Sequence, residues 1–317
     1  MKVGILTING FNCGSFLQAF ALKKVIEQLN HEVYIIDTLK IQGFIKILAY
    51  PNPFSSFAFK KAYNFISEWK KQKKSYSRKK YDVIVIGSDV VWRDTNPSFK
   101  KFFGNDIYAD KIITYAPCCS DTKYENLKKE QIEGIRNMDC LSARDNKTAE
   151  LIEKVTGKKP PIVLDPTFLI DWSKYKVASN IDNFLLAYSY HPGSHPKNYR
   201  DMIVTAKDVS LKTGKKIVNA MENETWCDIC IPAKPFEFLG LIKASDGIFT
   251  TSFHGTVFSL IYKKPFASFP GSHKVEFLLD SFKIEHNTLF SDYSKINHML
   301  KTKREESIKY LKDSLES

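Results

Sequence analysis

The sequence of 317 residues has no long hydrophobic run, few cysteines and no recognisable leader at its start. No apolar stretch approaches the roughly 20 residues that a membrane-spanning helix needs. A strand pattern follows Met1 almost at once, where a signal peptide would place a charged and then an apolar segment. The six cysteines are irregularly spaced and do not have the pattern of a disulfide framework. We therefore expect a globular protein that stays in the cytosol.

Acidic residues are in the minority, and the basic excess is concentrated in one segment. The net charge is +12, from 47 Lys and Arg against 35 Asp and Glu. Residues 54–80 contain nine Lys and Arg but only one acidic residue, Glu68. Aromatic and apolar residues between the lysines predict a basic amphipathic helix here; they are Phe57, Tyr63, Phe65, Ile66 and Trp69.

This basic helix has two interpretations of similar merit. It has the charge and the apolar side chains for peripheral contact with an anionic membrane surface or for facing an anionic substrate. Alternatively, its apolar stripe docks on its own domain and its lysines are solvated. No helix-turn-helix, zinc-finger or RNP pattern accompanies it, so we expect no nucleic acid partner.

Strand and helix patterns alternate along the chain, which is typical of an α/β fold. Strands are predicted at 3–7, 32–37, 81–86, 112–115, 140–143, 162–164, 184–188, 216–219 and 247–250, with a further short strand after Pro265. Helices are predicted at 15–30, 146–155, 197–213, 236–244, 256–262, 274–282 and 294–315. The order predicts two Rossmann-like domains facing each other across a cleft, at 1–170 and 180–293, with residues 294–317 packing back toward the first domain. Ligands of such sheets bind at the carboxyl ends of the strands.

The stretch 247–269 places more candidate functional groups at the carboxyl end of a strand than any other stretch. An apolar strand is followed by a polar turn, 251–255, and then by a helix, so unpaired N–H groups and the positive end of a helix dipole lie behind the turn. His254 adds a titratable imidazole beside Gly255, where the backbone can be approached closely. A lone histidine in a lone turn is more often a helix cap or a core residue. A functional role for His254 therefore depends on what lies at the other strand ends.

Three other strand ends carry polar groups that suit an anion or a sugar. A flexible loop at 9–15 opens the first helix, and its N–H groups could contact an anion. Asp89, after the strand 81–86, is a carboxylate for acid-base work or for holding a hydroxyl, although Ser and Asp also cap helices well. Arg144 has the planar fork that matches carboxylate or phosphate, although a structural ion pair is the simpler interpretation.

Five groups of residues together resemble the motifs of the polysaccharide pyruvyl transferases. In chain order they are NCGSFLQAFAL at 12–22, GSDVVW at 87–92, SARD at 142–145, DPTFL at 165–169, and TSFHGTVFS at 251–259 with KPF at 264–266. The resemblance runs through most of the chain and implies a two-domain fold like that of the GT-B glycosyltransferases. The sequence departs from the family in having Val90 where Gln is usual and Lys274 where Arg is common, and Lys lacks the bidentate fork.

The resemblance implies transfer of a pyruvyl group from phosphoenolpyruvate to two hydroxyls of a sugar, which forms a cyclic ketal and releases phosphate. On this basis His254 and Asp89 are the expected catalytic residues. The expected phosphoenolpyruvate-binding residues are Arg144, Lys274, Ser252 and Gly255. The expected acceptor or anion loop consists of Asn12, Gly14, Ser15, Gln18 and Ser88. The scheme needs no metal and no cofactor, since phosphoenolpyruvate is the donor substrate.

The expected acceptor is a sugar of a cell-surface polysaccharide precursor, such as an exopolysaccharide, on a lipid-linked oligosaccharide. The enzyme would then work at the inner face of the membrane, with the helix in 54–80 as the peripheral contact. Two alternatives are a GT-B glycosyltransferase that uses a nucleotide sugar and a non-catalytic carbohydrate-binding relative. Cys227 and Cys230 have CxxC spacing, but they lack both the strand-to-helix context of a redox motif and two further zinc ligands.

Overall fold

The computed structural model describes residues 1–36, 55–72, 74–75, 80–93, 97–175, 178–189 and 195–317. Its first sheet has the strand order β3-β2-β1-β4-β5, and every neighbouring pair is parallel. These strands are β1 (Lys2–Leu6), β2 (Glu32–Ile36), β3 (Lys74–Ser75), β4 (Tyr81–Ile86) and β5 (Ala109–Thr114). The interior strand β4, between β1 and β5, is almost entirely apolar and buried, as expected for the interior of a parallel sheet covered on both faces.

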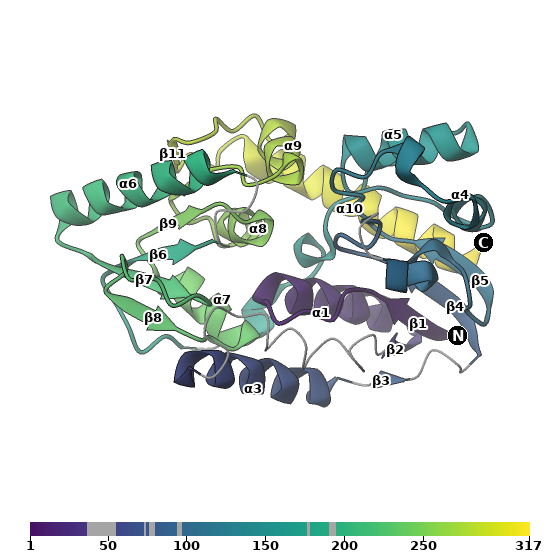
Figure 1. Ribbon diagram of the computed structural model, residues 1–317, viewed down its shortest axis with the longest axis horizontal. Helices are drawn as coiled ribbons and strands as arrows, with labels where there is room; N and C mark the ends of the chain where they lie inside the picture. The colour runs from purple at the N-terminus through teal and green to yellow at the C-terminus, as the bar shows by residue number, and fades with distance from the viewer. Residues whose placement is uncertain (37–54, 73, 76–79, 94–96, 176–177, 190–194) are drawn as a thin grey trace.

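The second sheet has the order β11-β10-β9-β6-β7-β8, and only the edge strand β11 runs antiparallel to its neighbour. Its strands are β6 (Phe184–Tyr188), β7 (Lys216–Ala220), β8 (Ile229–Ile231), β9 (Gly247–Thr250), β10 (Phe266–Ser268) and β11 (Leu289–Phe290). The chain thus forms two Rossmann-like domains, one around each sheet, which lie on the right and on the left of Figure 1. Their exact boundaries stay a prediction.

Helices cover both sheets and occupy the space between them (Figure 1). They are α1 (Cys13–Gln28), α3 (Ser56–Lys71), α4 (Lys129–Arg136), α5 (Asn146–Thr156), α6 (Pro196–Thr213), α7 (Pro235–Ala244), α8 (Phe253–Tyr262), α9 (His273–Ser281) and α10 (Ile296–Glu316). Among the described residues, none of the helices combines the length and the apolar character needed to cross a membrane.

Two predicted strands and the start of one predicted helix differ from the observed structure. The predicted strands at 140–143 and 162–164 are wrong: these segments form only isolated bridges, Ile113 to Cys140 and Ala143 to Ile162. Helix α8 begins at Phe253 instead of Thr256 because the side chain of Ser252 caps it by accepting a hydrogen bond from the N–H of Gly255. His254 therefore lies in the first helical turn, not in a loop before it.

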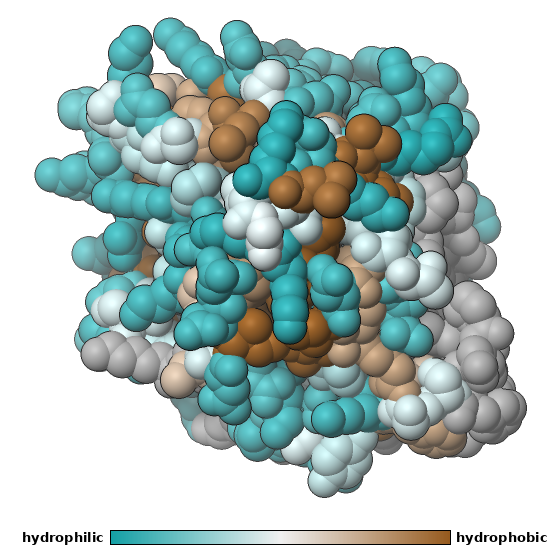
Figure 2. All heavy atoms as spheres, turned by 90° about the vertical axis from the view of Figure 1, so that its left-hand side faces the viewer, coloured by the Kyte–Doolittle hydropathy of each residue, from teal (hydrophilic) through white to brown (hydrophobic). Residues whose placement is uncertain are grey.

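Aromatic packing between α1 and α7 joins the domains through an apolar core. Phe16 and Phe20 of α1 both contact Phe236 of α7 edge to face, with ring centroids 6.0 and 5.1 Å apart. One continuous hydrophobic cluster includes buried residues of both sheets, such as Val3 and Leu186. The far end of the second domain presents mainly hydrophilic side chains, with hydrophobic ones in separate groups between them (Figure 2).

The C-terminal helix α10 runs from the second domain along the first (Figure 1). The hydroxyl of Tyr310 donates to the carbonyl oxygen of Thr114 at the end of β5, at 3.2 Å. Ser307 accepts a hydrogen bond from the N–H of Leu164 at 2.9 Å. The segment after Leu164 is thus held between the two domains and α10, and this places Asp165 close to both sheets.

The basic segment forms α3 only over Ser56–Lys71, and this helix is docked on the protein. Phe65 and Trp69 are buried, and the indole N–H of Trp69 donates to the carbonyl oxygen of Gly10 at 3.0 Å. Lys61 is buried as well and forms an ion pair with Glu222 of the second domain, with Nζ and Oε1 2.8 Å apart. Part of the predicted helix, residues 73 and 76–79, lies outside the described residues.

Candidate active site

The N-terminal ends of two helices meet between the domains. Gly14 lies in the first turn of α1 and His254 in the first turn of α8. They approach so closely that a Cβ atom on Gly14 would overlap the imidazole ring. Gly255 has a similar constraint, since a Cβ there would overlap the side chain of Thr250 at the end of β9. Both glycines are therefore explained by close packing around His254.

Asp165 lies beside this histidine and connects it to the first domain. Its Oδ2 atom is 3.6 Å from His254 Nε2 and accepts hydrogen bonds from Arg144 Nη1 at 3.0 Å and from Ser88 Oγ at 3.2 Å. Its other oxygen accepts from the hydroxyl of Thr167 at 2.7 Å. Burial by itself would raise the pKa of Asp165, but His254, Arg144 and Thr167 together hold this pKa well below its usual range. Asp165 is thus a fixed anion next to the imidazole.

Arg144 is buried, yet its hydrogen bonding is incomplete. The Nε and Nη2 atoms have no hydrogen-bond partner among the described residues, although the side chain is only 2% exposed. The guanidinium group lies over the ring of Phe253, with Cζ 4.4 Å from the ring centroid. Because buried donors are nearly always paired in folded proteins, these two nitrogens are available to donate hydrogen bonds to a ligand.

Asp89 and Lys274 complete the charged cluster from opposite domains. Asp89 Oδ2 accepts a hydrogen bond from the hydroxyl of Ser15 at 2.8 Å, and its Oδ1 is 3.8 Å from Arg144 Nη2. Burial tends to raise the pKa of Asp89, but the charges of Lys274 and Arg144 outweigh this effect and lower it. Lys274 opens α9, and its Nζ is 5.8 Å from the ring centroid of Phe253. Burial and the nearby charge of Arg144 lower the pKa of Lys274.

Three further predicted site residues form hydrogen bonds that shape the loop and the neighbouring strand ends. Asn12 caps α1, since its Oδ1 accepts from the N–H of Ser15 at 2.7 Å. Gln18 is fully buried and donates to Thr7 Oγ1 at 2.9 Å. Ser88 is fully buried too and donates to Asp165, as described above. These side chains therefore fix the ends of β1 and β4 beneath the charged cluster.

Two residues of the cluster were missed as individual candidates in the sequence. In the sequence, Asp165 stands out only as part of the motif at 165–169, and Phe253 only as part of the motif at 251–259. An aspartate that directly follows an apolar segment, 162–164, is the signal that could have identified Asp165. Phe253 gives no comparable signal, because an aromatic residue beside a turn is common in any core.

The charges of the cluster nearly balance before any ligand binds. Arg144 and Lys274 face the carboxylates of Asp89 and Asp165, and the imidazole of His254 lies between them. The N-terminal ends of α1 and α8 add unpaired N–H groups and the positive ends of two helix dipoles. The arrangement can bind an anion and, through a histidine oriented by a carboxylate, move a proton beside it.

The CxxC residues lie apart from this cluster, at the edge strand β8. Burial raises the pKa of the Cys227 thiol to about 12 and also raises that of Cys230. Cys230 Sγ accepts from the N–H of Glu224 and donates to its carbonyl oxygen, both at 3.3 Å. Thiols with raised pKa values are poor nucleophiles. Among the residues that the structure describes, no group of three His, Cys, Asp or Glu side chains is arranged to hold a metal ion.

Comparisons with known proteins give one family and one fold. The family model for polysaccharide pyruvyl transferase matches residues 12–273, which contain all the members of the charged cluster except Lys274. A search of curated proteins finds no match.

Solved structures that are similar to the chain include several UDP-GlcNAc 2-epimerases. The enzyme from Neisseria meningitidis, bound to UDP-GlcNAc, has a TM-score of 0.55 at 11% identity, over 99% of each chain. The enzyme from Methanocaldococcus jannaschii, in complex with UDP-GlcNAc and UDP, has a TM-score of 0.52 at 13% identity, over 96% of this chain and 93% of that one. At such identities the likeness shows the fold alone, which is the GT-B-like pairing of two Rossmann-like domains.

Proposed function

The chain belongs to the polysaccharide pyruvyl transferase family and is therefore a transferase, and from this premise we propose that it moves the pyruvyl group of phosphoenolpyruvate to two hydroxyls of a sugar. One observation carries the proposal. A buried arginine with two unpartnered nitrogens, Arg144, lies beside a buried histidine and carboxylate pair, His254 and Asp165. The reaction needs both functions, because a small anion must be bound and a proton donor must lie next to it.

The donor carries a carboxylate and a phosphate, and the cluster offers several groups to hold them. Arg144 Nε and Nη2 can donate two parallel hydrogen bonds to one of these anionic groups. Lys274 supplies a point charge from the other domain. Burial and the repulsion from Arg144 lower its pKa, and a bound anion would relieve that repulsion. The first N–H groups of α8, which Ser252 and Gly255 shape, are also suited to phosphate.

The chemistry proceeds in two steps with His254 as the proton carrier. In the first step His254 gives a proton to C3 of phosphoenolpyruvate, so the methylene becomes a methyl group, while a sugar hydroxyl attacks C2 and passes its own proton to the imidazole. In the second step the C2–O bond to phosphate breaks and the second hydroxyl attacks C2 and loses its proton, which closes the ketal ring. Asp165 holds the imidazole in place and stabilises its protonated form.

Asp89 suits the acceptor side of this reaction. Its lowered pKa keeps it ionised at neutral pH and makes it a weak base. An ionised carboxylate that already accepts from Ser15 can accept a further hydrogen bond from a sugar hydroxyl and so orient it. We therefore assign Asp89 to positioning the acceptor, with proton transfer left to His254.

The acceptor in this proposal is a lipid-linked sugar of an exopolysaccharide or another cell-surface precursor. The outer face of α3 gives the protein a means of approaching the membrane that holds such a sugar. Phe59, Tyr63 and Ile66 are 52%, 71% and 39% exposed and lie at i, i+4 and i+7 on one face of the helix. Exposed lysines accompany them, among them Lys60 and Lys70. Aromatic side chains together with lysines suit the headgroup region of an anionic bilayer.

Thermal unfolding with phosphoenolpyruvate tests donor binding. At a concentration of 100 times its Kd, a ligand that binds only the folded state stabilises it by about 2.7 kcal/mol. We expect this rise in melting temperature with the parent chain and with Arg200→Ala, which removes an exposed arginine of α6. We expect none with Arg144→Ala or, should that variant fail to fold, with Lys274→Met. A rise with UDP-GlcNAc but not with phosphoenolpyruvate would favour a nucleotide-sugar glycosyltransferase.

A second measurement separates binding from chemistry. His254→Gln removes the proton carrier and leaves the arginine in place, so phosphoenolpyruvate should still raise the melting temperature. Phosphate release with a suitable sugar acceptor should fall by about 10²–10⁴-fold, the usual contribution of general acid-base catalysis. A variant that keeps full activity would rule out His254 as the proton carrier.

A further inference from the structure

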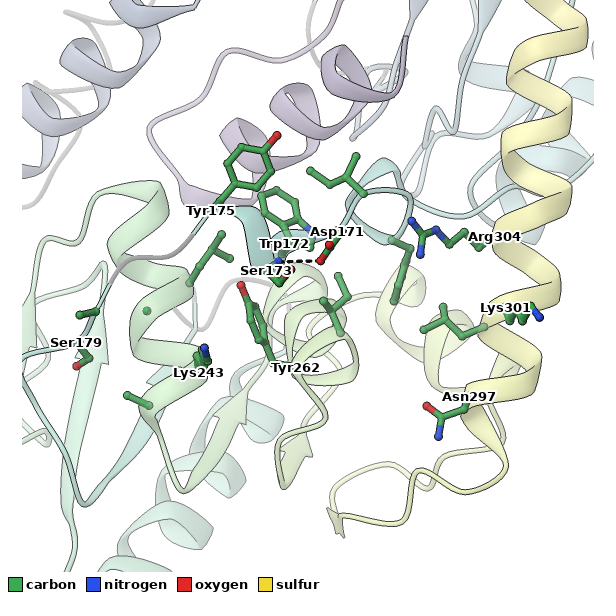
Figure 3. Close-up of a pocket in the computed structure, with 18 residues that line it drawn as sticks. Asp171, Trp172, Ser173, Tyr175, Ser179, Lys243, Tyr262, Asn297, Lys301 and Arg304 are labelled. Carbon is green, nitrogen blue, oxygen red and sulfur yellow. Dashed lines mark hydrogen bonds between the residues drawn. The ribbon is translucent and has the colours of Figure 1, made fainter. Parts of the chain in front are cut away.

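A large cavity lies at the segment that links the two domains, away from the charged cluster. Its volume is about 880 Å³, within the usual range for small-molecule sites. Its walls come from the linking residues 168–175 and 178–179, from the C-terminal parts of α7 and α8, and from α10 (Figure 3). We name it the linker pocket. His254, Arg144 and Asp89 are not among its lining residues.

Most of the lining of the linker pocket is apolar. Leu239 of α7, Ile261 of α8 and Leu300 of α10 come from three different helices, and Trp172 of the linking segment adds an aromatic ring. The hydroxyl of Tyr262 points toward Asp171 and Ser173 in the middle of the view (Figure 3). Burial raises the pKa of this tyrosine to about 12, so it stays a neutral donor. A ligand of this pocket therefore needs a substantial apolar part.

Cations predominate at the same pocket. Lys243, Lys301 and Arg304 line it, against the single carboxylate of Asp171. The carboxylate of Asp171 accepts a hydrogen bond from the N–H of Ser173 at 2.9 Å, so it is already paired within its own turn. Arg304 donates through Nη2 to the carbonyl oxygen of Leu169 at 2.8 Å, and this contact fixes its guanidinium beside the linking segment. The side chains of Lys243 and Lys301 form no ion pair with any residue in the described part of the chain.

We propose that the linker pocket binds an amphiphilic phosphate, a molecule with one alkyl or prenyl chain and a phosphate group. The apolar side chains of α7, α8 and α10 take the chain, and the two cations of α10, Lys301 and Arg304, attract the phosphate, while Lys243 lies on the opposite wall with α7 (Figure 3). A neutral amphiphile gains nothing from these cations, and inorganic phosphate gains nothing from the apolar walls. Selectivity for a molecule with both parts is therefore the distinguishing property of this site.

The site is independent of the proposed reaction, although it shares two elements with the charged cluster. Helix α8 has His254 in its first turn and Tyr262, which lines the pocket, at its last residue. Phe168, another lining residue, follows Asp165 by only three positions. A bound amphiphile would thus contact the elements that carry the histidine and carboxylate pair without touching that pair.

Calorimetric titration of the full chain with dodecyl phosphate, below its micelle concentration, tests the proposal. We expect one equivalent to bind at least about 10-fold more tightly than dodecyl maltoside, the neutral probe, or dodecyltrimethylammonium, the cationic one. Inorganic phosphate added at the same concentration should not weaken this binding. Equal binding of the neutral and the phosphate amphiphile would overturn the proposal, because the cations would then have no part in recognition.

Two variants locate the site. Lys301→Glu should weaken dodecyl phosphate binding about 10-fold or more, while Lys312→Glu, the same change at an exposed lysine further along α10, should leave it unaltered. Ala244→Phe places a ring in the pocket from the end of α7 and should abolish binding at an unchanged melting temperature. Undiminished binding in both Lys301→Glu and Ala244→Phe would place the amphiphile elsewhere and refute the proposal.

Discussion

Two groups of buried charges join the first domain to the second, and they differ in whether the protein itself satisfies them. At α3, Lys61 and Glu222 form a close ion pair, with Nζ and Oε1 2.8 Å apart. In the charged cluster, Arg144 and His254 each approach Asp165, but Arg144 Nε and Nη2 and His254 Nε2 are left without a hydrogen-bond partner among the described residues. In a completed pair each charge is compensated within the fold, whereas incomplete groups are available to a ligand.

The largest effect that separates the two groups should come from Lys61→Met. Removing one partner leaves Glu222 buried and unpaired, which typically costs about 3–5 kcal/mol of the free energy of unfolding. The double variant Lys61→Met with Glu222→Met should recover most of this loss, because no uncompensated charge remains. Urea unfolding followed by circular dichroism measures both. The single and the double variant should keep the phosphoenolpyruvate-dependent rise in melting temperature. Loss of that rise would show that α3 contributes to phosphoenolpyruvate binding.

A smaller effect should follow from Gly14→Ala, which adds one methyl group where α1 meets α8. The new Cβ would overlap the imidazole of His254, so the ring must move, and a displacement of about 1 Å near the chemistry can cost about 10² in rate. Gly247→Ala is the matched control, since its Cβ would meet Leu185 at an ordinary 3.4 Å. Steady-state kinetics of phosphate release compares them. Similar rates in the two variants would show that the ring position is not critical.

The smallest effect concerns acid stability. Because the pKa of Asp165 is lowered by folding, its contribution to stability is complete above the unfolded pKa of about 3.9 and is lost as the pH falls through lower values. Between about pH 4 and pH 2 the parent chain should therefore lose up to about 1.4 kcal/mol per pH unit on account of this group. Asp165→Asn should have a shallower slope in the same range. Chemical unfolding at each pH measures both slopes, and parallel curves would contradict the assignment.

The parts of the fold that depend on local patterns were predictable from the sequence. The mostly apolar residues in 81–86 predicted the interior strand β4, and the helical pattern in 294–315 predicted α10 nearly to its ends. The start of α8 was misplaced because Ser252 was assigned to a turn, although serine is a favoured cap. The segments 140–143 and 162–164 are mainly apolar, but they form only isolated bridges, from Cys140 to Ile113 and from Ala143 to Ile162, which local pattern does not reveal.

The sequence was sufficient to predict which residues form the site, but not which of them contact one another. Asp89, Arg144 and His254 each follow an apolar segment, so their common location could be inferred from the rule for parallel sheets. The contact between His254 and Asp165 could not, because it depends on how one domain is placed against the other. The burial of Lys61 is a similar case, since its partner Glu222 lies 161 residues away in the chain. A lysine in a basic segment is otherwise expected to be solvated.

The position of α3 has a consequence for how ligands enter and leave. Along α3 the domains are held by the buried ion pair of Lys61 and by Asn64, whose side chain donates to the carbonyl oxygen of Pro232 at 2.6 Å. At the opposite edge, where α5 and α9 face each other (Figure 1), a hydrogen bond at 2.7 Å between His273 and Asn146 is only partly buried. The two edges are thus unequal in strength. We expect α3 to act as the fixed side of any domain rotation, and the contact between α5 and α9 to open when substrate is admitted and product released.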